Sequence, residues 1–187
     1  MSKLRIIIIF VSIIILVDGT VLIFRNTNYY KSVQASKQLV VAIENADVEK
    51  AIDIVKQCPN CVNALPSMMP YWLQVISDSP DFYYPLQEAC AWERYDIVKL
   101  LIDNGADVNC AYRGIESSAT PLIMTIKIHS KLPWMDKASP LREATIDIIN
   151  LLLEHGADKS IKDTQGKTAY NYAVESGFSD LAELLKP

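Results

Sequence analysis

The tripeptide Gly-Ala-Asp occurs twice in this chain, at residues 105–107 and 156–158, and each copy follows an apolar run with helical periodicity. Those runs are residues 97–102 and 148–153. A glycine directly after an amphipathic helix is typical of a C-terminal cap, where the backbone turns left-handed. A short helix of this kind cannot bury its apolar stripe alone, so each unit needs a stacked neighbour. The recurrence therefore predicts an all-α repeat solenoid.

The N-terminal residues have a different character. Residues 6–24 read IIIIFVSIIILVDGTVLIF, with Asp18 as the single charge. As a helix they would span roughly 28 Å, close to the ~30 Å hydrocarbon thickness of a bilayer. Their fifteen Ile, Leu, Val and Phe side chains favour insertion by roughly 5–9 kcal/mol, against at most about 3.5 kcal/mol for Asp18. We expect a basic tail at residues 1–5, one transmembrane signal anchor at 6–24 and a linker at 25–35.

A cleaved signal peptide is the alternative, because Lys3 and Arg5 precede a twelve-residue apolar stretch ending at Val17. Cleavage would release a secreted repeat domain acting as an effector or inhibitor. The apolar run resumes at residues 21–24, which favours an uncleaved anchor. The short N-terminal tail favours a single-pass topology with the repeats outside the cytoplasm.

Charge and motif content narrow the classes of function. Residues 25–187 carry sixteen Lys and Arg against twenty-one Asp and Glu, a net charge of −5. This balance argues against nucleic acid or an anionic lipid surface as a partner of the repeats. The chain contains no Gly-rich phosphate loop, HExxH motif or GxSxG motif. We expect no catalytic residue, metal, cofactor or small-molecule substrate.

Three segments resemble the ankyrin repeat, a turn and two antiparallel helices in about 33 residues. Residues 84–109 read YPLQEACAWERYDIVKLLIDNGADVN, where the family pattern begins Thr-Pro-Leu-His and ends Gly-Ala-Asp-Val-Asn. TPL at residues 120–122 and DTQGKTA at residues 163–169 also match. The resemblance implies about four helix-turn-helix repeats within residues 36–187, in units at about 36–63, 80–111, 115–160 and 163–187. The first and last units are atypical, as terminal caps are.

The spacing of these units implies two insertions, at about residues 64–79 and 129–144. The first is too apolar for an ordinary solvated loop. In the second, Ser139 is placed to cap a helix that begins at Pro140. In the last unit, Asp180 and Glu183 have the spacing of a capping box.

The resemblance also implies a protein–protein interaction module, whose contacts come from turn tips and inner helices. The corresponding positions here are Asp81, Tyr83, Ala91, Trp92, Glu116, Ser117, Lys127, Ile128, Thr164, Gln165 and Lys167. Tyr83 and Trp92 are the predicted anchors, because large rigid aromatic side chains dominate binding energy where they are exposed. The alternative for Trp92 is packing against the insertion at 64–79.

One motif could carry chemistry, the Cys58-Pro59-Asn60-Cys61 segment. Redox enzymes place this spacing at a helix N-terminus, which lowers a thiol pKa, whereas here it follows a predicted helix. Four interpretations stay open: a disulfide between Cys58 and Cys61 outside the cytosol, an inert turn, a metal site, and a redox accessory protein. Cys90 stands where the family has Ala, so we expect it to be buried.

Overall fold

The structure of the chain, a computed structural model, describes residues 28–64, 84–111, 119–130 and 143–186. Within these ranges the regular structure is entirely helical, which confirms the all-α prediction for them. The predicted membrane span at residues 6–24 lies outside the described ranges, as do most of the two insertions and the expected cap at Ser139. Among the helices that are described, none combines the length and the apolar character needed to cross a bilayer.

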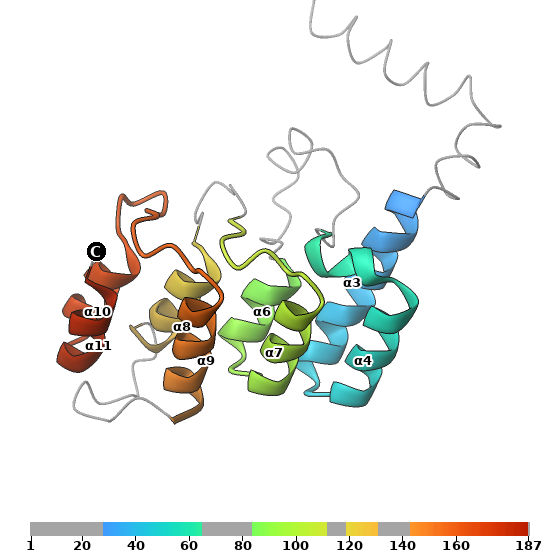
Figure 1. Ribbon diagram of the computed structural model, residues 1–187, viewed down its shortest axis with the longest axis horizontal. Helices are drawn as coiled ribbons and strands as arrows, with labels where there is room; N and C mark the ends of the chain where they lie inside the picture. The colour runs from blue at the N-terminus through green and yellow to red at the C-terminus, as the bar shows by residue number, and fades with distance from the viewer. Residues whose placement is uncertain (1–27, 65–83, 112–118, 131–142, 187) are drawn as a thin grey trace, which may run out of the picture.

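The helices form four stacked antiparallel pairs (Figure 1). The pairs are α3 (Asn28–Glu44) with α4 (Val48–Gln57), α6 (Pro85–Ala91) with α7 (Tyr95–Asp103), α8 (Pro121–Ser130) with α9 (Glu143–Glu154), and α10 (Ala169–Glu175) with α11 (Ser179–Leu185). The first helices of the pairs, α3, α6, α8 and α10, contact one another in sequence and form an inner row. Helices α4, α7 and α9 form an outer row in the same way. This arrangement is consistent with an ankyrin-repeat solenoid.

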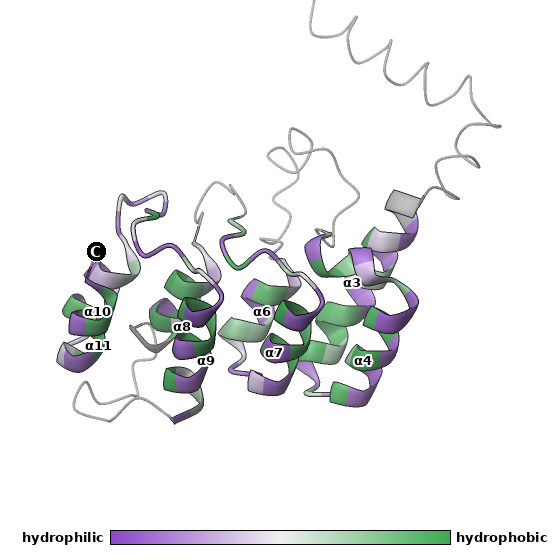
Figure 2. Ribbon diagram, in the orientation of Figure 1, coloured by the Kyte–Doolittle hydropathy of each residue, from purple (hydrophilic) through white to green (hydrophobic). Residues whose placement is uncertain are grey.

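The apolar periodicity of each helix decides which side faces its neighbours. In α7 the buried side chains are Ile97, Val98, Leu101 and Ile102, which recur at the three- and four-residue spacing of one helical face. Lys99 and Asp103 lie on the opposite, exposed side and form an ion pair of 3.3 Å. Figure 2 shows the hydrophobic sides of paired helices facing one another. The core therefore runs along the array between the two rows.

Glycine ends the outer helices as the sequence predicts. Gly105 has a φ of 82° and Gly156 a φ of 86°, in the left-handed region where an L side chain is strained. After α7, the amide of Gly105 donates to the carbonyl of Ile102 at 2.9 Å and the next amide donates to Leu101 at 3.0 Å. These bonds satisfy carbonyls that the helix end would otherwise leave unpaired.

The three described hairpins that join an inner to an outer helix, those after α3, α6 and α10, share one backbone conformation. Ala46, Glu93 and Gly177 have φ values of 56°, 53° and 79°, respectively. In the first hairpin the following amide, that of Asp47, donates to the carbonyl of Ala42 at 2.8 Å. The same bond recurs in the other two hairpins. Only one of the three positions is glycine, so two hairpins hold a side chain in a conformation that usually disfavours it.

The start of α11 differs from the prediction. The helix begins at Ser179 with Phe178 as its N-cap, and no side-chain hydrogen bond caps it. The capping box predicted from Asp180 and Glu183 is therefore wrong: Glu183 instead pairs with Lys186 at 3.6 Å, one turn further on. The prediction for Cys90 is confirmed, because its side chain is fully buried.

Candidate functional site

Trp92 directly follows the last turn of α6 and is the most informative of the predicted contact residues. Its backbone amide donates to the carbonyls of Glu88 and Cys90, which holds the residue at the helix end. The side chain is 48% exposed, although tryptophan is usually well buried. Glu88 lies one turn earlier on the same helix, and the Trp92 side chain acts to lower the pKa of its carboxyl group. Trp92 therefore presents a large, oriented aromatic surface at the hairpin end of the inner row.

Neighbouring residues extend this surface to α3. Val41 is 47% exposed and lies one turn before Glu44 on α3, the helix that packs against α6. Burial, followed by the nearby charge of Glu44, raises the pKa of Glu88, and the indole of Trp92 opposes this shift. We call Val41, Glu44, Glu88 and Trp92 the inner-helix patch. It combines two exposed apolar side chains with two neighbouring carboxylates.

Arg94 fixes the two helices of the inner-helix patch relative to each other. It lies in the hairpin after α6, and its Nε donates to the carbonyl of Ile43 at 3.3 Å. Its Nη2 donates to the carbonyl of Glu44 at 3.4 Å. The guanidinium thus caps the C-terminal end of α3, where a cation is favoured by the helix dipole.

The other predicted contact residues fall into three groups. Asp81, Tyr83, Glu116 and Ser117 lie outside the described ranges. Thr164 and Gln165 are exposed in the turn before α10, whereas Ala91, Ile128 and Lys167 are half-buried. Lys167 forms an ion pair of 2.7 Å with Glu175. Lys127 is the remaining residue, and its position differs from the prediction.

Lys127 is buried, with only 6% of its surface exposed, so its predicted role in contacting a partner is wrong. Its ammonium lies 3.6 Å from the carboxylate of Asp163 and 5.4 Å from the ring centroid of Tyr172. Both of these residues belong to the last unit. Alignment placed Lys127 on the open inner face, but the last unit packs over α8 and covers it.

Asp163 is the centre of this buried polar cluster. Its Oδ2 accepts a hydrogen bond of 2.6 Å from the hydroxyl of Tyr172, while Oδ1 accepts from the amides of Gln165 and Lys167 at 2.9 and 3.1 Å. Burial acts to raise the pKa of Asp163, but these bonds and the charge of Lys127 outweigh it and lower the pKa. The cluster therefore stabilises an ionised carboxylate between the third and fourth units.

Two asparagines at the turn ends link successive units, a role that sequence reasoning did not assign. Asn63 donates to the carbonyl of Gly105 at 2.8 Å and accepts from the amide of Asp107 at 2.8 Å. Asn109 makes the same two hydrogen bonds to the next unit. Its side chain donates to the carbonyl of Gly156 at 3.1 Å and accepts from the amide of Asp158 at 2.8 Å. The recurrence of Val-Asn at residues 62–63 and 108–109 was the available signal.

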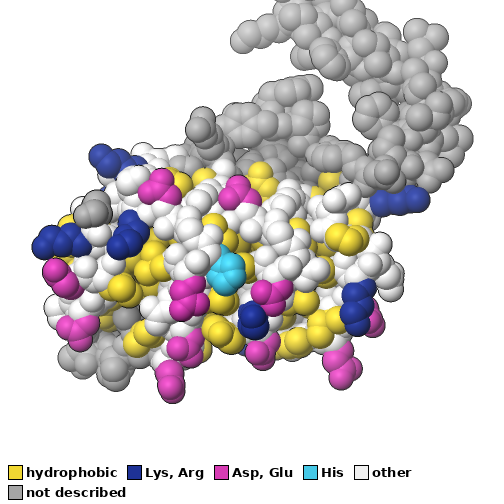
Figure 3. All heavy atoms as spheres, viewed as in Figure 1, with side chains coloured by type: hydrophobic (Ala, Val, Ile, Leu, Met, Phe, Trp, Pro, Cys, Tyr) yellow, Lys and Arg dark blue, Asp and Glu magenta, His cyan; other side chains and the backbone are white. Residues whose placement is uncertain are grey.

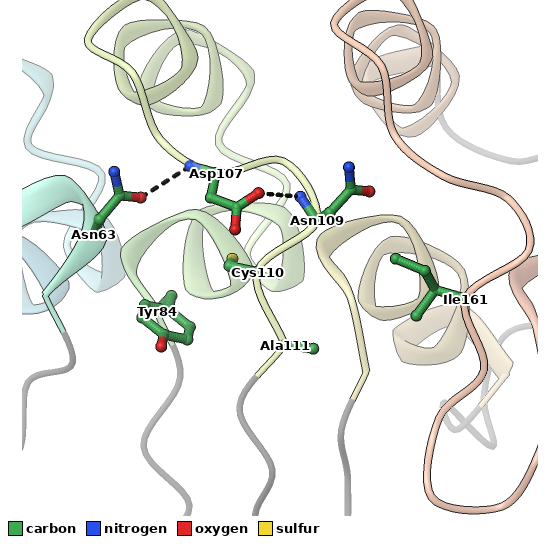
Figure 4. A pocket seen from close by; sticks show the side chains of 7 residues that line it. All are labelled: Asn63, Tyr84, Asp107, Asn109, Cys110, Ala111 and Ile161. Atoms are coloured by element: carbon green, nitrogen blue, oxygen red, sulfur yellow. Dashed lines mark hydrogen bonds between the residues drawn. The ribbon is translucent and has the colours of Figure 1, made fainter.

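A groove of about 730 Å³ crosses these turn ends (Figure 4). Residues from three successive units line it: Asn63, Tyr84, Asp107, Asn109, Cys110, Ala111 and Ile161. The side chains of Asn63, Asp107 and Asn109 are engaged with backbone groups, since Asp107 also accepts from the backbone amide of Asn109 at 2.9 Å. The groove follows the seam between units and is not an independent ligand site.

The cysteines lack the environment of a reactive thiol pair. All four are free thiols, and Cys58 and Cys61 lie on either side of the start of η1 (Pro59–Asn63), after α4. Burial, followed by the influence of Cys58, raises the pKa of Cys61 to about 12. A redox nucleophile needs the opposite shift. Within the described ranges, no three His, Cys, Asp or Glu side chains group as metal ligands would.

Comparison with known proteins agrees with this architecture. The family model described as "Ankyrin repeat" matches residues 81–112. The chain is 28% identical over 104 residues to "Ankyrin repeat and SOCS box protein 11" of Mus musculus, which covers 54% of this chain and 26% of that protein. It is 24% identical over 169 residues to "Putative ankyrin repeat protein YahD" of Escherichia coli strain K12, covering 77% of this chain and 72% of that protein.

These matches support the ankyrin-repeat family for this chain, and with it a protein-interaction module. The chain spans about a quarter of the length of the mouse relative. The likeness to that protein therefore concerns its repeats.

The outer face of the array, shown in Figure 3, carries Asp and Glu side chains along its lower edge.

Proposed function

We propose that this chain is a membrane-anchored ankyrin-repeat module that binds a protein partner and performs no catalysis itself. The inner-helix patch carries the proposal, because Trp92 exposes a large aromatic surface at the end of α6, where its backbone amide is hydrogen-bonded. Exposed, oriented tryptophans contribute strongly to protein interfaces. The family match and the relatives support the interaction function, and the composition of residues 6–24 supports the anchor.

A photo-cross-linking experiment in living cells tests the binding function. In this experiment a photoreactive amino acid replaces Val41, which belongs to the inner-helix patch together with Trp92 and is exposed. We expect a discrete cross-linked product that Trp92→Ala reduces at least about fivefold. Ile146→Ala is the matched control, because Ile146 is 42% exposed on the outer helix α9. Equal cross-linking in the Trp92→Ala and Ile146→Ala variants would refute the site.

The anchor is tested by alkaline carbonate extraction and by protease digestion of intact cells. We propose a single-pass protein whose repeats lie outside the cytoplasm. The expected result is retention in the membrane fraction, with the repeats digested from outside. Counting free thiols on the same sample shows whether Cys58 and Cys61 are then oxidised. A mature mass that lacks the first 19 residues would instead support a secreted repeat domain.

A further inference from the structure

The inner-helix patch places apolar surface and negative charge next to each other. Val41 and Trp92 expose 47% and 48% of their surfaces on consecutive inner helices. Glu44 lies one turn after Val41, and Glu88 lies one turn before Trp92. Each exposed apolar side chain thus has a carboxylate beside it on the same helix.

The two carboxylates also affect each other across the contact between α3 and α6. Burial and the charge of Glu44 together disfavour ionisation of Glu88, and only the indole of Trp92 counteracts them. A carboxylate that has lost part of its hydration gains more from an added cation than a fully hydrated one does. Arg94 is at the same edge, but its Nε and Nη2 donate to the backbone carbonyls that end α3.

We propose that the inner-helix patch binds a protein segment that presents a Lys or Arg side chain beside an apolar one. The apolar side chain packs against Val41 and Trp92. The cation meets the carboxylates of Glu44 and Glu88, and the electron-rich face of the Trp92 indole attracts it as well. This inference rests on the proposed binding function and adds the chemistry of the partner.

Fluorescence of Trp92 in the full-length chain tests this chemistry. Trp72→Phe and Trp134→Phe remove the other two tryptophans, so emission reports the patch. The probes are two synthetic peptides of equal length and leucine content, one with arginine and the other with glutamate at the remaining positions. We expect the arginine peptide to shift the emission saturably, with weaker affinity at higher salt. The glutamate peptide should leave the emission unchanged.

Charge removal at the patch gives the matched comparison. Glu44→Gln combined with Glu88→Gln should weaken binding of the arginine peptide about five- to tenfold. Glu88→Gln leaves the backbone hydrogen bonds of Trp92 to the end of α6 unchanged. Glu154→Gln removes one negative charge, as each single patch variant does, at the exposed end of α9 and should leave affinity unchanged. The salt titration of the parent chain makes the same test should the double variant fail to fold.

The outcomes separate this inference from the proposed function. Equal binding of both peptides, or an affinity that neither salt nor the double variant alters, would overturn the partner chemistry. A cross-link from residue 41 that still depends on Trp92 would then leave the binding function standing. Loss of peptide binding together with a cross-link that ignores Trp92→Ala would overturn both.

Discussion

Replacing Asp163 with asparagine tests the buried cluster between the third and fourth units. The side chain of Asp163 is fully buried, and that of Lys127 is 8% exposed. Asparagine keeps one oxygen for the amides of Gln165 and Lys167, which now bond to Oδ1. The second oxygen becomes an NH₂ group that points donors at the Lys127 ammonium. The substitution therefore leaves a buried cation without its counter-charge.

The expected loss in the free energy of unfolding is large for a change of so few atoms. Breaking one side of a buried ion pair typically destabilises a protein by about 3–5 kcal/mol. The hydrogen bond of 2.6 Å from the Tyr172 hydroxyl to Oδ2 is also lost, because an NH₂ group replaces its acceptor. Lys127→Met should lower the free energy of unfolding by less than about 2 kcal/mol, because Asp163 then keeps its three hydrogen bonds.

Urea unfolding followed by circular dichroism measures both losses. Asp103→Asn is the control, since the pair of Asp103 with Lys99 is about half exposed and should contribute less than about 1 kcal/mol. The double variant of Asp163→Asn and Lys127→Met should lose less than the sum of the single losses, because no unpaired charge stays buried. Hydrogen exchange in α10 would show whether the last unit opens first.

The pH dependence has a defined sign. The folded-state pKa of Asp163 lies below its ordinary value, so the carboxylate adds stability above the unfolded pKa of about 4. That contribution is lost as the pH falls through the folded pKa. The difference between the parent chain and Asp163→Asn should be constant near neutral pH and shrink in acid. A loss below about 1 kcal/mol at pH 7, or a larger loss for Lys127→Met, would refute the reasoning.

Three further changes test the solenoid. Asn109→Ala removes both hydrogen bonds to the next turn. In urea titrations it should lower the free energy of unfolding by about 1–2 kcal/mol. An unchanged value would contradict a stabilising role for these two bonds. Ala46→Gly relieves the strain of a φ of 56° and should raise the midpoint of thermal unfolding, whereas Gly177→Ala should lower it. Changes of the midpoint in the same direction for both variants would argue against backbone strain. Leu101→Ala opens a cavity at a fully buried position and should destabilise by about 2–5 kcal/mol, measured by the same titration.

The helices and their ends could be predicted because they depend on nearby residues. The apolar spacing of residues 97–102 defines the buried face of α7. Gly105 and Gly156 mark the helix ends, since their left-handed conformation is a local property of the chain. The capping box predicted from Asp180 and Glu183 is wrong, because α11 begins at Ser179 after Phe178, so Asp180 lies within the helix.

The candidate site was predictable only in part. Resemblance to a repeat pattern predicted Trp92 as a contact residue, and its side chain is exposed, yet Val41, Glu44 and Glu88 were not predicted. Their common surface forms because α3 packs against α6, and these helices are separated by more than forty residues in sequence. One signal was present, since Glu88 is the single charged residue in residues 84–91, directly before Trp92.

By itself the sequence determined the repeat, its helices and the glycines that end them, because each of these follows from side chains within one unit. Only the tertiary structure decided which polar groups are exposed. The sequence predicts Lys127 on the surface. Its flexible apolar stem instead packs between the third and fourth units, so that its ammonium pairs with Asp163 of the fourth unit. Burial of such a side chain depends on the unit stacked beside it, and the local sequence pattern does not show where that unit packs.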